Sequence, residues 1–291
     1  MALDEPARIL YVADYNNNCI RGVNTSSAMV TTFAGQMYGS PTYTDGAATV
    51  AGFNQPSGVA YGAGTVFVTE PNYIRAVDVA TRVTTTLAGK GWPAACSNGV
   101  GTNAEFSYPS GIAYLSGTVF VGDNCGWVRA IDVSTRAVTT LATSTLVYGS
   151  LAGVGAMTAS TAGVLYFVAN NQIWACVIAT GVVTLVAGSG ANDYVNGVGA
   201  SAMFNHIYGI GVDDVLGKLY VSDGWNSRVR LVDISSTMVT DLVGGNYAYI
   251  NGRGGAVGFM SPAGIAVDSA SNIYIADYQN TAIRFIARAG V

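Results

Sequence analysis

The chain has 291 residues, of which 50% are hydrophobic and 10% charged, and its net charge is −4. Disordered chains combine low hydrophobicity with high charge, so this composition excludes disorder and indicates a folded domain with a large core. Only two basic residues are lysines and the eleven arginines are spread along the chain, so we expect no nucleic-acid partner. Apolar stretches are interrupted within about ten residues, short of the roughly 18 that span a bilayer, so we expect no membrane insertion.

The first pattern along the chain is Ile9-Leu-Tyr-Val-Ala-Asp14, and it recurs five times. The later copies are Val66-Phe-Val-Thr-Glu70, Val119-Phe-Val-Gly-Asp123, Leu165-Tyr-Phe-Val-Ala-Asn170, Leu219-Tyr-Val-Ser-Asp223 and Ile273-Tyr-Ile-Ala-Asp277. The acid or amide that ends each copy is spaced 56, 53, 47, 53 and 54 residues from the previous one. The chain therefore contains six copies of one structural unit.

Each copy lies inside a set of four short runs rich in β-branched and aromatic residues, separated by turn residues. Four strands of about five residues, repeated at this period, are typical of propeller blades. A β-helix would need a shorter repeat, and a sandwich would not repeat its loops in register. We predict an all-β fold, a six-bladed β-propeller forming one domain over residues 1–291. The approximate blades are 1–35, 58–89, 111–144, 155–188, 209–244 and 264–291.

The sixth blade ends after its third strand, so the pattern gives 6 × 4 − 1 = 23 strands. We expect an unpaired strand edge along Ala282 to Ala287. One explanation is that a longer polypeptide supplies the strand from an upstream segment that reads like Val-Thr-Thr-Leu-Ala-Gly. Another is that a neighbouring molecule donates it by β-augmentation, which would make the chain an assembly subunit. The third is a closed ring with a three-stranded last blade.

A 14-residue loop motif precedes four of the blades. Its copies are Asp45–Gly58, Asn98–Gly111, Asn196–Gly209 and Asn251–Gly264, with Phe53, Phe106, Phe204 and Phe259 in identical register. The initial Asp-Gly or Asn-Gly is expected to form a turn with positive φ. The phenylalanine is expected to anchor the loop between blades, and the Pro-x-Gly that ends most copies to interrupt regular structure.

The last repeat shows a family pattern most fully. It reads Gly264-Ile-Ala-Val-Asp268, Ile273-Tyr-Ile-Ala-Asp-Tyr-Gln-Asn280 and Ala282-Ile-Arg284, and it resembles the NHL repeat, a likeness that covers nearly the whole chain. The resemblance implies a six-bladed propeller used mainly for binding, as in extracellular sensor domains and RNA-binding regulators. Some related propellers are enzymes.

An arginine follows the acidic residue by five to seven positions in five repeats. The pairs are Asp14 and Arg21, Glu70 and Arg75, Asp123 and Arg129, Asp223 and Arg230, and Asp277 and Arg284. In the remaining repeat both residues change together, to Asn170 and Trp174. Joint loss is what a structural ion pair predicts, because losing one partner would leave a buried charge unpaired. The alternative is a ring of arginines around an anion site.

Aromatic residues gather in the two kinds of loop that share one face of such a fold. They are Tyr15, Tyr43, Tyr73, Trp92, Trp127, Tyr194, Trp225, Tyr247, Tyr249 and Tyr278. Tyr and Trp offer rigid contact area with a polar tip, as binding hot spots do. We predict a protein, peptide or glycan site on this face. The alternative is that these side chains only cap the blades.

Catalytic constellations are sparse. His206 is the single histidine, which excludes a three-histidine zinc site and leaves no basis for a nucleophile triad, so we expect a non-catalytic protein and treat His206 as an ordinary loop residue. We expect no cofactor. The alternative function is a calcium-dependent lactonase or other hydrolase, with Asp4, Asp213 and Asp268 as candidate Ca²⁺ ligands. Their simpler role would be to cap turns.

The four cysteines allow one bridge. Cys96 precedes the third blade and Cys125 lies in that blade, on the same face, so we predict a disulfide between them. Cys176 is expected to be a small buried residue, and Cys19 has no partner in an adjacent blade. A disulfide, few lysines and the glycosylation sequon at Asn24 indicate an extracellular or cell-surface location, with any secretion signal outside this sequence.

Residues 137–192 contain no charged side chain. Exposed strands usually carry charge that deters association, so we predict that another copy, a domain or a glycan covers this side. The alternative is a surface coated with Ser, Thr and Asn. The sequence as a whole predicts a non-catalytic extracellular binding or assembly module, with self-association through residues 137–192 or through the open edge of the sixth blade.

Overall fold

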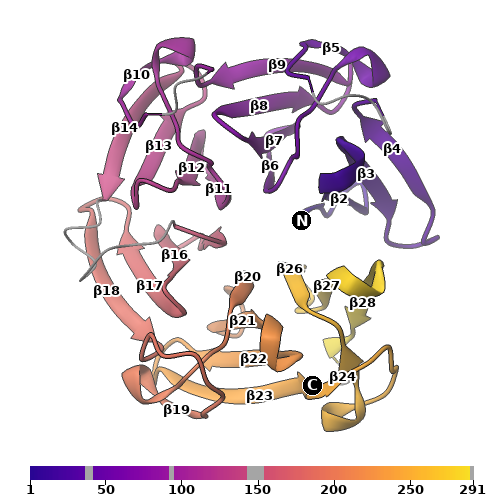
Figure 1. The fold of residues 1–291 in the computed structure, drawn as a ribbon, viewed down its shortest axis with the longest axis vertical. Coiled ribbons are helices and arrows are strands. Elements are labelled where there is room, and N and C mark those ends of the chain that lie inside the picture. The colour runs from indigo at the N-terminus through magenta and orange to yellow at the C-terminus, as the bar shows by residue number, and fades with distance from the viewer. Residues whose placement is uncertain (37–41, 92–94, 143–153, 289–291) are drawn as a thin grey trace. The chain divides into compact units, whose positions relative to one another are not determined.

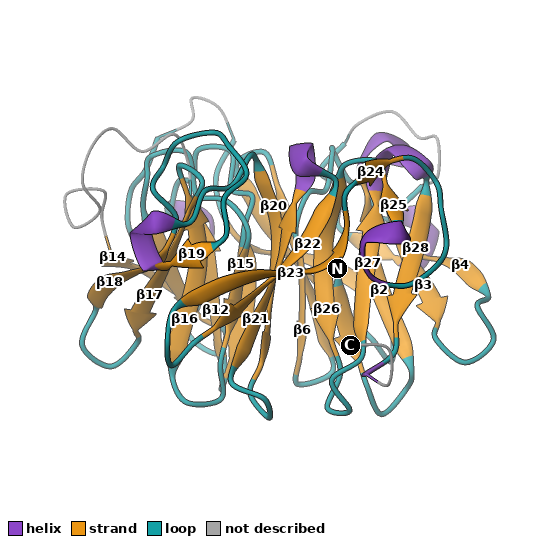
Figure 2. Ribbon diagram, turned by 90° about the horizontal axis from the view of Figure 1, so that it is seen from below, coloured by secondary structure: helices purple, strands orange, loops and turns teal. Residues whose placement is uncertain are grey.

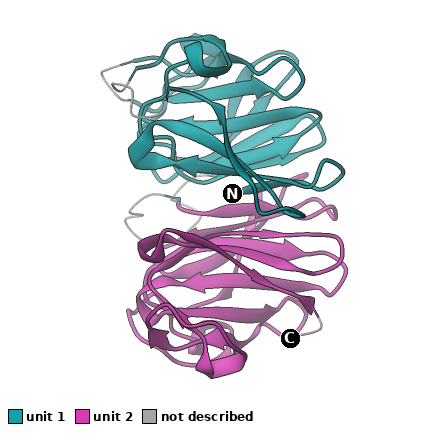
Figure 3. Ribbon diagram, turned by 90° about the vertical axis from the view of Figure 1, so that its right-hand side faces the viewer, with its two compact units in different colours: residues 1–154 teal, residues 155–291 magenta. Residues whose placement is uncertain are grey.

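The computed structural model describes residues 1–36, 42–91, 95–142 and 154–288, and its regular structure consists of strands and three-residue 3-10 helices (Figure 1). The fold is all-β, a six-bladed β-propeller, as the repeat predicted. Contacts divide the chain into two compact units, residues 1–154 and 155–291, each with three blades (Figure 3). None of the described helices has the length and apolar character that crossing a membrane requires.

Unit 1 contains three antiparallel sheets. The first sheet holds β1 (Ala2–Asp4), β2 (Ile9–Asp14), β3 (Cys19–Asn24) and β4 (Val30–Ala34). The second holds β5 (Gly46–Ala47), β6 (Val59–Gly62), β7 (Thr65–Glu70), β8 (Tyr73–Asp78) and β9 (Val83–Ala88). The third holds β10 (Gly99–Val100), β11 (Ile112–Leu115), β12 (Thr118–Gly122), β13 (Val128–Asp132) and β14 (Ala137–Ala142). The described 3-10 helices of unit 1 are η1 (Tyr15–Asn17), η2 (Ala48–Val50) and η3 (Gly101–Asn103).

Unit 2 repeats the arrangement. The fourth blade holds β15 (Met157–Ala159), β16 (Val164–Ala169), β17 (Gln172–Val177) and β18 (Val182–Ala187). The fifth holds β19 (Gly197–Val198), β20 (Ile207–Asp213), β21 (Lys218–Asp223), β22 (Arg228–Asp233) and β23 (Met238–Gly244). The sixth holds β26 (Pro262–Val267), β27 (Ile273–Asp277) and β28 (Ala282–Ile286), next to a small parallel pair, β24 (Asn246–Tyr247) and β25 (Gly258–Phe259). Its helices are η5 (Gly199–Ser201), η6 (Gly224–Asn226), η7 (Gly254–Ala256) and η8 (Tyr278–Asn280) (Figure 2).

Short fifth strands are a feature that the strand count from sequence missed. The segments β5, β10 and β19 pair with the outer strands β9, β14 and β23. Each of these segments belongs to the loop that precedes its blade, so the loop is hydrogen-bonded to the outer strand of that blade. This pairing covers an edge that would otherwise expose unpaired backbone groups.

A β-bulge marks the same place in five blades. The register between the third and fourth strands shifts just before Arg21, Arg75, Arg129, Trp174 and Arg230. A bulge bends its strand and redirects the side chain beside it. At Arg75, Arg129 and Arg230 the bulge lies beside a long side chain that leaves the sheet and enters the preceding loop.

The core of each unit lies between neighbouring sheets. Val, Ile, Leu and Phe side chains of the strands form its buried clusters, and the four loop phenylalanines are at most 1% exposed within them. The prediction that these phenylalanines anchor the loops is confirmed. Burying an aromatic ring of this size contributes roughly 2 to 3 kcal/mol through the hydrophobic effect alone.

The predicted positive φ at the Asp-Gly or Asn-Gly turn is found at Gly46 but is wrong in the three other copies of the motif. Gly99, Gly197 and Gly252 do not have positive φ, and β10 and β19 begin at the first two. Left-handed backbone occurs later in the motif, at the four equivalent positions Gln55, Tyr108, His206 and Ser261, whose φ lies between 43° and 57°. The initial Asp or Asn has a different role, because its side chain binds an arginine.

Candidate functional site

Four of the predicted acid and arginine pairs form ion pairs in the structure. The N···O distances are 2.8 Å for Arg75 and Glu70, 3.4 Å for Arg129 and Asp123, 2.8 Å for Arg230 and Asp223, and 2.8 Å for Arg284 and Asp277. All eight side chains are at most 9% exposed. Burial raises the pKa of Asp123 and Asp223, while the paired arginines act to lower it.

The loop motif completes each arginine site. Arg230 donates to the Met203 and Val195 carbonyls and, at 2.6 Å, to Asn196 Oδ1, and its guanidinium lies 5.2 Å from the centre of the Phe204 ring. The same set of an amide or carboxylate, two carbonyls and a phenylalanine surrounds Arg75, Arg129 and Arg284. Every guanidinium thus binds its own blade to the preceding loop, which is a structural role.

The first blade corrects one expected pair. Among the described residues Asp14 and Arg21 are not bridged: Asp14 accepts a hydrogen bond from Asn17, and Arg21 donates to Thr32 at 3.3 Å. In the four blades with a bridge, the preceding loop motif excludes water from the guanidinium. Arg21 itself is only partly buried.

The second blade differs from the others in charge. Arg75 lies between two carboxylates, 2.8 Å from Glu70 and 2.7 Å from Asp45, whereas asparagine occupies the position of Asp45 in the third, fifth and sixth blades. Burial raises the pKa of Glu70 to about 7, Arg75 and the Asn54 amide oppose that rise, and Asp45 adds to it.

This arrangement makes stability depend on pH. Because the pKa of Glu70 is higher in the folded protein, its contribution is fully present below its ordinary pKa of 4.5 and is lost as the pH rises through about 7. We expect the free energy of unfolding to fall between pH 5 and pH 8 by more in the wild type than in Glu70→Gln. Urea titrations at the two pH values measure the difference. An equal fall in the wild type and in Glu70→Gln would contradict the assignment of the pH dependence to Glu70. Asp45→Asn, which removes the nearby charge, should give a fall of intermediate size.

In unit 2, an exposed group of rings forms at the turn between β21 and β22. Trp225 stacks on His206 with 3.7 Å between ring centres and an interplanar angle of 14°, and its indole N–H donates to the Tyr208 hydroxyl at 2.9 Å. Trp225 is 59% exposed and Tyr208 44% exposed. We call these three residues the aromatic patch. Two partly buried asparagines add neutral hydrogen-bonding groups beside the patch. Asn205 forms a hydrogen bond with His206 Nδ1, and the side chain of Asn171 accepts one from the His206 backbone amide.

The aromatic patch contains two residues that sequence reasoning did not place in a site. His206 occupies the left-handed loop position, and Tyr208 lies at a bulge in β20 where the register shifts between Ile207 and Gly209. Gly224 permits the arrangement, because a Cβ there would lie 2.3 Å from the Tyr208 ring. A signal was present in the sequence. His206 and Tyr208 lie on either side of Ile207, the first residue of the inner strand, and Trp225 lies in a turn of the same blade.

The other predicted aromatic residues lie in several settings. In unit 2, Tyr247, Tyr249 and Tyr278 are 57–61% exposed, with the Tyr247 hydroxyl bonded to Gln279 and the Tyr249 ring 4.8 Å from the Arg284 guanidinium. Tyr194 is bonded to Asp241 and packs under Arg228. In unit 1, Tyr15 is exposed, Tyr43 and Tyr73 pack against each other at 4.6 Å, and Trp127 lies near Arg129. Trp92 lies outside the described residues.

The aspartates considered as calcium ligands cap turns. Asp4 accepts from the Ala7 amide, Asp213 from the Val215 and Leu216 amides, and Asp268 from Ala270 and Asn272. Asn24 likewise accepts from the amides of Ser26 and Ser27.

Cys96 and Cys125 are joined by a disulfide, and Cys19 and Cys176 are free and buried. Asp123 lies beside the bridge and accepts from the Cys125 amide at 3.1 Å. Cys96, Asp123 and Cys125 form a group close enough to hold a metal among the described residues, but their two sulfur atoms are bonded to each other.

The fourth blade carries the uncharged stretch. Its outer strand β18 exposes Val182 and Thr184, and among the described residues no fifth strand pairs with it. Residues 143–153, at the position of the preceding loop, lie outside the described residues. Coverage of residues 137–192 by a partner stays a prediction.

Six blades, four of which carry the arginine and phenylalanine anchor, define the chain as a propeller built from six copies of one unit. No model of a known protein family matches it. The curated protein SUPPRESSOR OF QUENCHING 1, chloroplastic, from Arabidopsis thaliana is 25% identical over 299 residues, which cover 98% of this chain and 24% of the plant protein. The chain thus spans about a quarter of the length of that relative.

Solved structures show the same fold. An auxiliary nutrient binding protein from Bacteroides ovatus superposes with a TM-score of 0.72 and 16% identity, covering 98% of this chain and 67% of that one. One from Bacteroides thetaiotaomicron gives 0.69 and 17%, covering 96% and 66%. A nidogen/laminin complex gives 0.60 and 13%, covering 82% and 77%. At these identities the likeness shows the fold alone.

Proposed function

We propose that the chain is a non-catalytic extracellular binding module of the NHL-repeat type, and that the aromatic patch binds a glycan. The observation that carries the proposal is the flat, exposed Trp225 ring fixed between His206 and the Tyr208 hydroxyl. An exposed aromatic ring that is already held in place loses little conformational freedom on binding. The surrounding asparagines can hydrogen-bond sugar hydroxyls without imposing a charge.

Several features support this function. The residues considered for catalysis or calcium binding have structural contacts: His206 is stacked on Trp225 and bonded to Asn205, and the turn aspartates bond to backbone amides. The two Bacteroides proteins of the same fold are described as nutrient binding proteins. The Cys96 to Cys125 disulfide and the sequon at Asn24 agree with an extracellular location.

A glycan array probed with the intact protein, followed by titration of its tryptophan fluorescence, tests the proposal. Trp225→Ala is expected to weaken binding at least tenfold, because truncating a central aromatic contact costs about 2 kcal/mol or more. Val215→Ala changes an exposed apolar residue in the turn after β20, at the end of that strand away from Tyr208, and should leave the affinity unchanged. Equal affinity of Trp225→Ala and the wild type, or binding of peptides and no glycan, would overturn the glycan site.

A further inference from the structure

The acid at the end of the second strand of the third blade, Asp123, departs from the pattern of the repeat. In the second, fifth and sixth blades, the equivalent acid accepts a hydrogen bond from the amide of the residue that follows the loop phenylalanine. The pairs are Glu70 with Asn54, Asp223 with Asn205, and Asp277 with Met260. Among the described residues Asp123 accepts instead from two amides of its own turn, Cys125 at 3.1 Å and Trp127 at 3.4 Å.

The other carboxylate oxygen of Asp123 faces the disulfide. In the first, fifth and sixth blades, an asparagine three residues after the acid donates its side-chain amide to that acid. These asparagines are Asn17, Asn226 and Asn280. The third blade has Gly126 at this position, and Cys96 Sγ lies 3.4 Å from Asp123 Oδ2. A sulfur atom of the disulfide therefore lies where the other blades have a hydrogen-bonding amide.

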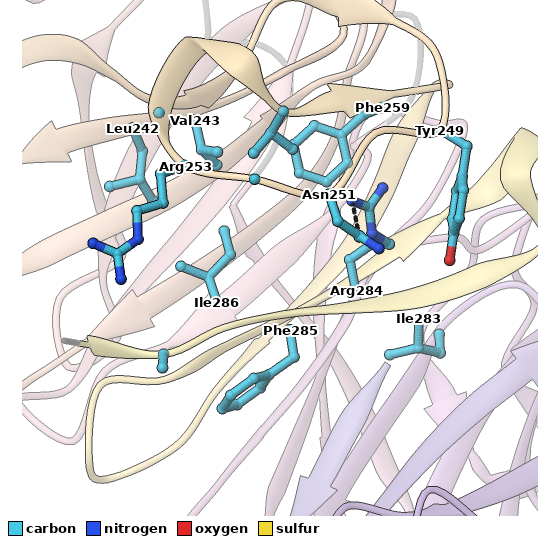
Figure 4. Close-up of a pocket in the computed structure, with 14 residues that line it drawn as sticks. Leu242, Val243, Tyr249, Asn251, Arg253, Phe259, Ile283, Arg284, Phe285 and Ile286 are labelled. Atoms are coloured by element: carbon cyan, nitrogen blue, oxygen red, sulfur yellow. Dashed lines mark hydrogen bonds between the residues drawn. The ribbon is translucent and has the colours of Figure 1, made fainter. Parts of the chain in front are cut away.

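The ion pair of the third blade is longer than the others. Arg129 lies 3.4 Å from Asp123 Oδ2, whereas the three other buried pairs are at 2.8 Å. Two carbonyls of the preceding loop and the Asn98 side chain, at 2.9 Å, also hold the guanidinium. Figure 4 shows the same arrangement in the sixth blade, where Arg284 binds Asn251. The position of Arg129 therefore does not depend on Asp123 alone, and Oδ2 can bind a second cation.

Three metal-binding atoms lie together here: the sulfur atoms of Cys96 and Cys125 and a carboxylate oxygen of Asp123, all within 4.8 Å of one another. A tetrahedral zinc ion, with bonds of about 2.3 Å to sulfur and about 2.0 Å to oxygen, separates a sulfur ligand from an oxygen ligand by about 3.5 Å. The 3.4 Å between Cys96 Sγ and Asp123 Oδ2 is close to this separation. The two sulfur atoms are too close while the disulfide joins them, and reduction of the bridge lets them separate.

The charges of the reduced site match a divalent cation. Two thiolates and the Asp123 carboxylate carry three negative charges, and Arg129 carries one positive charge, so one divalent cation makes the group neutral. Neutrality matters because Asp123 is fully buried, where an uncompensated charge is costly. Thiolate ligands select zinc over calcium and magnesium, which prefer oxygen ligands. Both cysteines are partly exposed, so water can supply the fourth ligand.

We propose that the reduced chain binds Zn²⁺ through Cys96, Asp123 and Cys125, and that the disulfide is the zinc-free form of the same site. A dithiol supplies the two electrons and two protons that convert the bridge into two thiols, and the dithiol itself becomes a disulfide. Zinc then displaces the two thiol protons, which pass to solvent, and two sulfur–zinc bonds form. In an oxidising compartment the bridge persists and zinc is not bound. The inference does not depend on the glycan proposal.

Zinc titration of the intact chain, oxidised and reduced, tests the proposal. A dithiol reduces the bridge in the absence of oxygen and is removed by gel filtration, and a chromophoric chelator then competes for the metal. We expect the reduced chain to bind one zinc ion and the oxidised chain to bind none. Asp123→Asn should weaken zinc binding at least tenfold, because a neutral amide oxygen is a poorer zinc ligand than a carboxylate. Asp223→Asn, the matched control, removes the equivalent buried acid of the fifth blade and should leave the zinc affinity unchanged.

A spectroscopic measurement keeps the proposal testable if the Asp123 variant does not fold. With Co²⁺ in place of zinc, the reduced wild type should show thiolate-to-metal charge-transfer absorption and the intense visible bands of a tetrahedral site, and added zinc should remove both. A cobalt spectrum without these bands would overturn the proposal. So would equal zinc binding by the oxidised and reduced chains, an unchanged affinity of Asp123→Asn, or zinc binding by Cys96→Ser/Cys125→Ser as tight as that of the reduced wild type.

Discussion

Replacing Arg230 with methionine is expected to lower the free energy of unfolding by about 3 to 5 kcal/mol. Arg230 and Asp223 are both fully buried and lie 2.8 Å apart. The substitution keeps much of the side-chain volume but leaves the Asp223 carboxylate buried without its cation. It also removes the N–H groups from which the Asn196 side chain and the Val195 carbonyl accept hydrogen bonds, so the loop before the blade loses its attachment.

Urea unfolding followed by far-ultraviolet circular dichroism measures this effect. Arg8→Met is the matched control, because Arg8 is exposed and donates to Ser26, and it should change the free energy by no more than about 0.5 kcal/mol. Adding Asp223→Asn to Arg230→Met should recover part of the loss, since the unpaired charge is then removed. If the Arg230 and Arg8 variants were equally stable, the ion pair would not be a structural anchor.

The six blades could be predicted from sequence because each repeat contains the same strand run with an acid or amide at its end. Runs that end at Asp14, Glu70, Asp123 and their equivalents recur at nearly constant spacing, and tertiary context cannot change so regular a strand pattern. Burial of the loop phenylalanines followed from the same logic, because an apolar ring held in register by four loops must share one environment.

The role of the motif's first residue could not be read from local propensity. An Asn-Gly pair is a turn signal by itself, yet Asn98, Asn196 and Asn251 accept hydrogen bonds from arginines 31 to 34 residues later in the chain. A long-range signal was present: the fourth blade lacks the 14-residue motif and also lacks the arginine, with Trp174 in its place. That joint loss would have linked the two sites.

The aromatic patch escaped prediction for a geometric reason. A β-bulge at the start of β20 places Tyr208 beside Trp225, and bulges leave no reliable mark in the sequence. The sequence identified Trp225 as an exposed ring in a turn but could not identify its neighbours. The same limit applies to the bulges before Arg75, Arg129 and Arg230, whose side chains enter the loop motif.

Removing the disulfide by the double substitution Cys96→Ser/Cys125→Ser is expected to lower the free energy of unfolding by about 3 to 4 kcal/mol. The bridge closes a loop with a sequence separation of 29 residues, and the loss of that constraint increases the entropy of the unfolded chain. A folded-state effect should add to it, since the bridge holds the segment whose Ser97 carbonyl and Asn98 side chain bind Arg129.

The measurement compares urea unfolding of the wild type and the double variant, each with and without a reductant. Reductant should destabilise the wild type to about the level of the variant and leave the variant itself unchanged, because the remaining cysteines, Cys19 and Cys176, are free thiols. Thiol titration of the unfolded, unreduced wild type should give two thiols. Four thiols, or a variant as stable as the wild type, would show that the bridge does not form in solution, and the support that it lends to an oxidising compartment would then be lost.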